Sequence, residues 1–346
     1  MPVIDEAVAL LDVTVCQPER CPDECDDQEE AVFVAVSAST DPASTGQACY
    51  LYTNVLGGDL DEWSNPITLS NWGQTVGENA DAVLCIGEFV VIASTTAGEI
   101  IYSDDLGTTQ VVVTNTDWIT NGPKDIDGID QSFLVMVHEN GHIYTSVDAG
   151  RTWSLSDDAQ ACSALHDYER VMIARDNAEV IFAVGCANTT DSTGSMTKST
   201  NGSENWFALT DPRTAETSFC YTALCVLNQS DVIVGCSDGE IWETEDGGVT
   251  WSQQLEPVGF PDLGPSVNDI VNCGCGVLWM AVSGTTASES VIYRNVDGGA
   301  SGKWFIPSEA DSLTQPPLAI ACASVNLAVA VGGVPASTSG MVVLLA

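Results

Sequence analysis

The chain has 346 residues, of which 45% are hydrophobic, so it holds enough apolar material for a globular core. Forty-nine acidic residues against nine basic ones give a formal net charge of −40, which argues against nucleic-acid binding because phosphates would be repelled. No apolar run reaches about 18 residues, so we expect no membrane span.

The acidic residues are spread along the whole chain rather than gathered in a tail, which argues against a disordered acidic segment. At molar ionic strength the Debye length falls to about 3 Å, and the mutual repulsion of these charges is screened. We interpret the composition as adaptation to high salt, as in proteins of halophilic archaea and their viruses. An acidic surface protein from ordinary salt is the alternative.

The N-terminal region begins with a predicted strand over residues 3–15. It carries acidic residues and no basic segment, so we expect no secretory leader. Residues 16–30 form a predicted loop rich in acid and cysteine, and Cys16, Cys21 and Cys25 are candidates for disulfides. The thirteen cysteines of the chain are an odd number, so at least one stays unpaired within the chain.

From residue 31 onward the chain repeats one order of elements. Each repeat contains an apolar strand, a polar turn, a second apolar strand, a Gly- or Ser-rich turn and a third strand, and most repeats end with a short recurring motif. No long helical periodicity occurs, so the pattern predicts an all-β fold. The repeats begin near residues 31, 81, 127, 170, 221, 268 and 318.

The motif is clearest in the third repeat, as Ser146-x-Asp148-x-Gly150-x-Thr152-Trp153. Asp148 can accept hydrogen bonds from backbone N–H groups further along the turn, Gly150 can adopt a left-handed conformation, and Trp153 supplies a large apolar face. A degraded copy ends at Trp206. The other copies contain Ser103, Asp105 and Gly107, then Asp246, Gly248 and Trp251, then Asp297, Gly299 and Trp304.

This motif resembles the Asp-box, or BNR repeat, of β-propellers, where it lies between the third and fourth strands of a blade. The resemblance covers nearly the whole chain and implies one propeller domain over residues 1–346. Residues 31–346 then supply seven blades of four antiparallel strands, with six or eight as alternatives. Because the last repeat stops after its third strand, we expect residues 3–15 to become its outermost strand and close the ring.

The resembling family includes sialidases, other glycosidases, sorting receptors, photosystem assembly factors and viral or secreted binding proteins, so it implies no single function. A sialidase holds its substrate carboxylate with three arginines. This chain has six, of which Arg20 lies in the cysteine-rich loop and Arg151 inside a motif, so we exclude that activity. A glycosidase needs only two facing carboxylates, and 49 acidic residues supply pairs without specificity.

One group of acidic residues has a spacing that suits a metal ion. Asp125, Asp127 and Asp130 are candidate Ca²⁺ ligands, although their pattern is not an EF-hand loop. We expect no other cofactor, and no catalytic residues, because no nucleophile elbow, phosphate-binding loop or dinucleotide fingerprint is present. The aspartates of the repeated motif are expected to stabilise turns.

We predict a non-enzymatic structural or recognition protein of a virus particle, serving as a capsid turret or decoration or as a tail attachment protein. It would be assembled in the host cytoplasm, would join other virion proteins in a homo- or hetero-oligomeric assembly, and would meet a host surface glycoprotein or glycan. One alternative is a glycoside hydrolase or sugar-binding propeller, which clustering of Trp72, Trp118 and Trp242 on one face would favour. Another is a cytosolic halophilic scaffold or assembly factor with reduced cysteines.

Overall fold

The structure is a computed structural model of the chain. It describes residues 10–16, 32–37, 49–55, 63, 67–69, 79–94, 98–115, 118, 122–139, 141–156, 166–187, 195–213, 219–254, 265–286, 289–298, 304–307, 313, 315–333 and 340–345.

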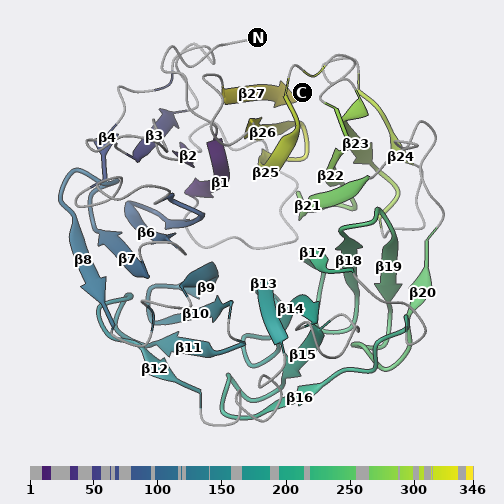
Figure 1. Cartoon of the computed structure of the whole chain (residues 1–346), viewed down its shortest axis with the longest axis horizontal. Helices are drawn as coiled ribbons and strands as arrows, with labels where there is room; N and C mark the ends of the chain where they lie inside the picture. The colour runs from purple at the N-terminus through teal and green to yellow at the C-terminus, as the bar shows by residue number, and fades with distance from the viewer. Residues whose placement is uncertain are drawn as a thin grey trace.

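Seven antiparallel sheets stand around a common axis as the blades of a ring (Figure 1). Six sheets have four strands, and the last has three among the described residues. The described part of the chain contains no helix, and hence none that could cross a membrane. The predicted all-β propeller with seven blades is confirmed.

Within each blade the strands follow one another from the axis to the rim. The first four blades consist of β1 (Leu10–Cys16), β2 (Val32–Ser37), β3 (Tyr50–Val55) and β4 (Ile67–Thr68); β5 (Ala82–Ile86), β6 (Phe89–Ser94), β7 (Glu99–Ser103) and β8 (Val111–Thr114); β9 (Pro123–Asp130), β10 (Phe133–His138), β11 (Ile143–Ser146) and β12 (Ser154–Leu155); and β13 (His166–Ile173), β14 (Ile181–Ala187), β15 (Ser195–Ser199) and β16 (Trp206–Ala208).

The remaining three blades have the same order. They consist of β17 (Tyr221–Val226), β18 (Val232–Cys236), β19 (Ile241–Thr244) and β20 (Ser252–Gln253); β21 (Ser266–Asn272), β22 (Leu278–Ser283), β23 (Val291–Asn295) and β24 (Trp304–Phe305); and β25 (Pro317–Ser324), β26 (Leu327–Gly333) and β27 (Gly340–Leu345).

The core of the molecule lies between blades rather than within them. Seven apolar clusters each join two successive blades, including the last and the first. Strands such as β6, with the sequence FVVIAS, are buried on both faces because a blade stacks on each side. This explains why the second strand of each repeat is almost wholly apolar instead of alternating.

The N-terminal strand lies elsewhere than predicted. Residues 3–9 are outside the described residues, but β1 pairs antiparallel with β2 as the innermost strand of the first blade. The expectation that residues 3–15 form the outermost strand of the last blade is therefore wrong. The sequence of β1, LLDVTVC, supplies apolar side chains to the interface between two blades, whereas outer strands such as β20 are short and exposed.

The first and last blades are instead joined by side-chain packing. Leu10 and Val13 of β1 lie in one cluster with Ala321 and Val329 of the last blade. The first strands of the third and fourth blades also begin four residues before the predicted positions, at Pro123 and His166.

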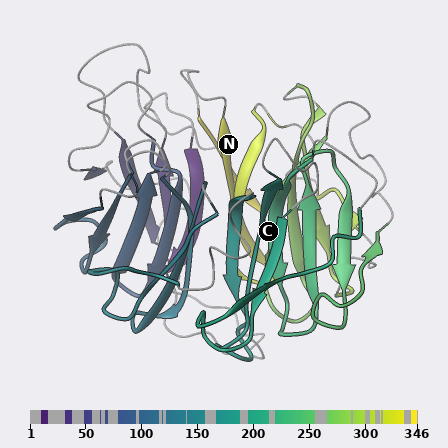
Figure 2. The ribbon, with the colours of Figure 1, turned by 60° about the horizontal axis from the view of Figure 1, so that its bottom comes forward.

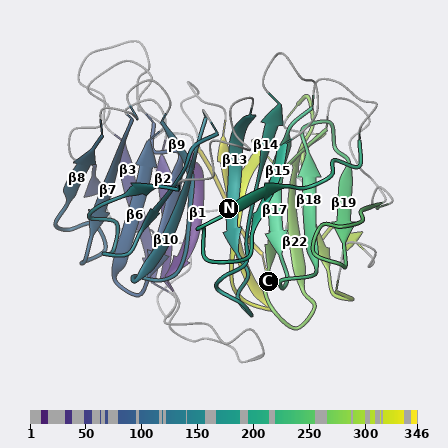
Figure 3. The ribbon, with the colours of Figure 1, turned by 90° about the horizontal axis from the view of Figure 1, so that it is seen from below.

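The alternating strand directions give the disc two distinct faces (Figures 2 and 3). The hairpins between first and second strands and between third and fourth strands share one side, which we call the lower face. The hairpins between second and third strands and the connections between blades share the other side, the upper face. The first strands run from the upper face to the lower face around the axis.

Candidate functional site

The first strands of all seven blades line a central channel with a volume of about 650 Å³. Five carboxylates, those of Asp12, Asp125, Asp127, Asp130 and Asp269, and two guanidinium groups, those of Arg170 and Arg175, line it. Three of these carboxylates and one guanidinium, from four of the first strands, form one electrostatic group. Arg170 interacts electrostatically with all three carboxylates. We call this set the channel cluster, and its members are Asp12, Asp125, Arg170 and Asp269.

Each carboxylate of the channel cluster also binds the backbone of the next blade. The Oδ2 atoms of Asp12, Asp125 and Asp269 accept hydrogen bonds from the N–H groups of Val83 at 2.7 Å, Val171 at 2.9 Å and Ile320 at 2.8 Å, respectively. The Oδ1 atoms of Asp12 and Asp269 accept the N–H of the following residue in their own strands, each at 2.9 Å.

Arg170 spans the channel. Its Nη2 donates a long hydrogen bond of 3.5 Å to the carbonyl oxygen of Asn268 in the sixth blade, while Nη1 donates to the carbonyl oxygen of Glu169 at 3.2 Å. Through its hydrogen bonds the channel cluster reaches the first, second, third, fourth, sixth and seventh blades, and in the fifth blade Cys225 interacts electrostatically with Asp269. The cluster is therefore part of what holds the ring together.

Enclosure in the channel changes the acidity of these carboxyl groups. Desolvation raises the pKa of Asp12 to about 8 and that of Asp125 to about 7, and Arg170 opposes both shifts. The pKa of Asp269 is raised for the same reason. All three side chains keep partial access to the water of the channel lumen, but protein surrounds them, and the cost of burying their charge exceeds the attraction of one guanidinium.

Glycosidases use a carboxylic acid with a raised pKa beside an ionised carboxylate as their catalytic pair. Here, however, the raised pKa accompanies a repeated structural contact. Both oxygens of Asp12 and Asp269 are occupied by backbone donors, and equivalent bonds recur in three blades. The geometry accounts for these residues as links between blades.

The residues of the repeated motif lie in hairpins between third and fourth strands, on the lower face. In the third blade the Ser146 hydroxyl donates to Asp148 Oδ1 at 2.9 Å and accepts the Gly150 N–H at 2.9 Å. Asp148 in turn accepts the N–H of Thr152 at 2.8 Å and its hydroxyl at 2.6 Å. These bonds stabilise the turn and lower the pKa of Asp148, with Thr152 as the main cause.

Other copies of the motif repeat this network. Asp105 accepts both the N–H and the hydroxyl of Thr109, and Asp246 accepts both from Thr250. In the degraded copy Asn201 accepts the N–H of Asn205 and the hydroxyl of Ser199, and Asn205 replaces the threonine that would donate a second hydroxyl. Ser103, Gly107 and Gly248 form hydrogen bonds within the equivalent turns, and Asp297 follows β23. Trp251 and Trp304 pack against the blade cores, and Gly299 is outside the described residues.

Gln110 stands where the third blade has Trp153, and it makes the same bond. The indole Nε1 of Trp153 donates to the carbonyl oxygen of Gly150 at 2.9 Å, and Nε2 of Gln110 donates to that of Gly107 at 3.0 Å. The substitution therefore preserves the polar contact and loses only the aromatic packing.

The three candidate calcium ligands are not brought together. Asp125 binds the fourth blade through Val171, as described above. Asp127 accepts the N–H of Ile173 and pairs with Arg175 at 2.6 Å. Asp130 accepts from Ser132 in its own turn. No group of three or more potential metal ligands occurs among the described residues.

Disulfides join neighbouring blades. Cys186 of β14 is bonded to Cys220 at the start of the fifth blade, and Cys273 of the sixth blade is bonded to Cys322 of β25. Cys85 and Cys275 are also disulfide-bonded. Of the predicted candidates, Cys16 ends β1, and Cys21 and Cys25 are outside the described residues.

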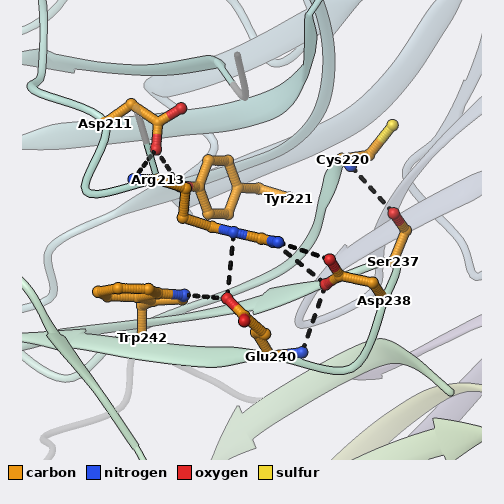
Figure 4. A network of polar contacts seen from close by, with 8 residues as sticks. All are labelled: Asp211, Arg213, Cys220, Tyr221, Ser237, Asp238, Glu240 and Trp242. Atoms are coloured by element: carbon orange, nitrogen blue, oxygen red, sulfur yellow. Dashed lines mark hydrogen bonds and ion pairs between the residues drawn. The ribbon is translucent and has the colours of Figure 1, made fainter. Parts of the chain in front are cut away.

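A compact polar network occupies the upper face of the fifth blade (Figure 4). The buried guanidinium of Arg213 pairs with Asp238 at 2.6 Å and with Glu240 at 3.1 Å, and stacks on Phe219 at 3.7 Å from the ring centroid. The Trp242 indole donates to the same carboxylate of Glu240 at 2.9 Å. We call these five residues the upper-face network.

The network is anchored from several directions. The Tyr221 hydroxyl donates to Asp211 at 2.8 Å, and Asp211 also accepts the Arg213 N–H at 2.8 Å. The Cys186–Cys220 disulfide lies immediately before Tyr221 in the chain. Asp238 remains 43% exposed, so the network presents a carboxylate to solvent on a rigid base.

The two described tryptophans of the predicted trio, Trp118 and Trp242, do not form an exposed platform that would indicate a sugar site. Trp118 is 1% exposed and packs edge-on against Tyr144 at 5.6 Å within the core. Trp242 is half-buried in the upper-face network, and Trp72 is outside the described residues.

No protein-family model matches the sequence, and neither does any curated protein. Solved structures do resemble the fold. A structure described as YCF48 bound to D1 peptide superposes with a TM-score of 0.66 at 14% identity, covering 99% of this chain and 95% of that one.

Two other resemblances come from different functional classes. A GH74 xyloglucanase from Xanthomonas campestris has a TM-score of 0.64 at 14% identity, covering 96% of this chain and 52% of that one. The WD40 repeats of RRP9 have a TM-score of 0.64 at 9% identity, covering 100% and 99%. At such low identity these likenesses establish the fold alone: the chain is a seven-bladed β-propeller.

Proposed function

We propose that the protein is a non-enzymatic recognition propeller that holds a segment of a partner protein on its upper face. The observation that carries this proposal is that the acidic residues of the channel are engaged in hydrogen bonds to the protein backbone. Asp12 and Asp269 have both oxygens bound to backbone N–H groups, so their raised pKa serves the ring rather than proton transfer to a substrate.

The upper-face network supports the location. The Arg213 side chain is 2% exposed, and two carboxylates and an aromatic ring hold its guanidinium, which fixes Asp238 and Trp242 in place before any partner binds. Preorganised side chains bind with a smaller loss of conformational entropy. A similar propeller has been solved with a peptide bound, which shows that this fold accommodates such a ligand.

Peptide binding can be tested directly with an array of random 12-residue peptides in molar NaCl, followed by titration of the best binders. We expect Trp242→Ala to weaken binding by about tenfold or more, since half-buried aromatic residues are frequent anchors. The matched control is Val249→Ala on the lower face, where Val249 is 75% exposed, and it should bind like the wild type. Absence of any peptide binding tighter than about 1 mM would overturn the proposal.

Hydrolysis is the competing function, and the resemblance to a xyloglucanase provides its assay. We expect no release of reducing ends from xyloglucan in molar salt. Turnover that disappears in Asp125→Asn, but persists in Trp242→Ala, would replace the recognition proposal with an enzymatic one.

We further propose that this recognition takes place in a virus particle of a salt-rich environment, where the protein contacts other virion proteins and the host surface. The net charge of −40 and the inter-blade disulfides support the proposal. Unreduced mass spectrometry of purified particles should find the chain at stoichiometric copy number. Its recovery only from cytosol, with reduced cysteines, would contradict the location without affecting peptide binding.

A further inference from the structure

The four residues of the channel cluster connect six of the seven blades by hydrogen bonds. Asp12 links the first blade to the second, Asp125 links the third to the fourth, and Asp269 links the sixth to the seventh. Arg170 adds the cross-channel contact from the fourth blade to the sixth. Loss of any one carboxylate contact therefore weakens a boundary between two blades.

The charges of the channel cluster do not balance. Three carboxylates share one guanidinium in an enclosed channel, so full ionisation leaves the carboxylates repelling one another with a single cation between them. The other charged or titratable groups nearby do not restore the balance. Asp127 is already paired with Arg175, Asp130 is a further carboxylate that accepts from Ser132, and Glu169 and Cys225 add no positive charge.

We propose that the channel cluster is a proton-dependent latch on the ring: uptake of protons by its carboxylates tightens the boundaries between blades, and their release loosens them. A neutral carboxyl group keeps a carbonyl oxygen that accepts the N–H of the next blade, while its repulsion with the other carboxylates disappears. In the described part of the chain no two blades share a strand, so the boundaries between blades are held by side-chain packing and by contacts such as those of the channel cluster.

The direction of the effect follows from linkage. A carboxyl group whose pKa is higher in the folded protein than in the unfolded chain binds more protons when folded. Its contribution to stability is complete below the unfolded pKa, near 3.8, and is lost as the pH rises through the folded value, which for Asp12 is about 8. Acidification from about pH 9 to pH 6 should therefore stabilise the ring.

The test is hydrogen exchange at the backbone amides of Val83 and Ile320, in molar NaCl, between about pH 6 and pH 9. After correction for intrinsic exchange, we expect the protection of both amides to fall by about tenfold or more as the pH rises, since one pKa unit corresponds to a tenfold change. In Asp12→Asn the protection of Val83 should stay level over this range, and Asp269→Asn should do the same for Ile320.

The matched control for charge is Glu204→Gln, which removes one acidic group from an exposed turn on the lower face and should keep the wild-type profile. Level protection in the wild type would overturn the latch. An equal fall in the wild type and in both asparagine variants would also overturn it, because the pH dependence would then arise outside the cluster. If the variants do not fold, the wild-type profile alone decides, with thermal unfolding over the same pH range as its second measure.

Discussion

Aspartate residues occur in two environments in this protein, and these shift the pKa of the side chain in opposite directions. In the turns of the lower face it accepts several hydrogen bonds while exposed, which stabilises its charged form, so the pKa of Asp246 is lowered to about 2, mainly by the Thr250 hydroxyl. In the channel the same side chain is enclosed, and the pKa of Asp12 is raised to about 8. The two kinds of aspartate therefore give stability that responds to pH in opposite directions.

Replacing Thr250, which donates its hydroxyl to Asp246, should change the pKa of Asp246. We expect Thr250→Val to raise the pKa of Asp246 toward its ordinary value of 3.8, because the bond from the hydroxyl to Oδ2 is lost. The wild-type turn is stabilised above about pH 4 and loses that stability as the pH falls through the lowered value, so the variant should begin to lose it at a higher pH. Carboxyl titration by NMR measures the shift directly.

The control is Thr114→Val, which removes an exposed hydroxyl from β8 and should leave the titration of Asp246 unchanged. An unchanged pKa in Thr250→Val would show that the Thr244 hydroxyl and the backbone donors hold the carboxylate without it.

At the scale of elements, the tight turns after the third strands depend on glycines with positive φ. Gly107 has a φ of 88° and Gly150 a φ of 72°, and both follow the aspartate of their motif by two residues. Their surroundings differ. A Cβ on Gly107 would collide with the buried side chain of Leu51 in the preceding blade, whereas a Cβ on Gly150 would make an ordinary contact of 3.5 Å with Val91.

These two glycines form a matched pair for measuring packing between blades. Gly150→Ala should cost about 1 kcal/mol or more from backbone strain alone. Gly107→Ala should cost about 1–3 kcal/mol beyond that, because the new methyl group overpacks the boundary between the first two blades. Denaturant unfolding of both variants measures the difference, and equal losses would mean that Leu51 moves aside freely.

Local elements were predictable from the sequence where their cause is local. The motif of Ser146 to Trp153 is contiguous, its hydrogen bonds join residues two to four apart, and the turn was found where it was expected. The channel cluster was not predicted, because Asp12, Asp125 and Asp269 are distant in sequence and meet only when the ring closes. A weak signal existed: each of these aspartates precedes Val or Ile within the first strand of its repeat.

At the scale of the whole molecule, ring closure was the part that sequence reasoning placed wrongly. The truncated last repeat suggested a missing outer strand, but the apolar residues of β1 are stabilised more by lying between two blades than by lying at the rim. The number of blades was predictable because it depends on counting repeats. The sheet that the N-terminal strand joins depends on whether it pairs more favourably with the first blade or with the last, and the sequence pattern does not show which pairing is more stable.

The inter-blade disulfides should contribute substantially to stability. Their sequence separations are 34 and 49 residues, for which the loop-entropy relation gives about 4 kcal/mol each. We expect the double variant Cys273→Ala with Cys322→Ala to unfold at markedly lower denaturant concentration, and the corresponding pair in the fourth and fifth blades to behave similarly. Replacing the buried thiol Cys225 by Ala is the control, and its smaller loss should be insensitive to reductant.

The scarcity of basic residues has a practical consequence for anyone handling the native molecule. All seven lysines and arginines among the described residues are engaged in internal contacts, and six of them reach from one blade to another, as Lys198 does to the carbonyl oxygen of Gly247. Trypsin cleaves after such side chains and must first release them from these contacts, so the described part of the folded ring offers it few cleavage sites. A protease that cleaves after acidic residues would find its sites on nearly every turn, and it is the better reagent for mapping which face a partner covers.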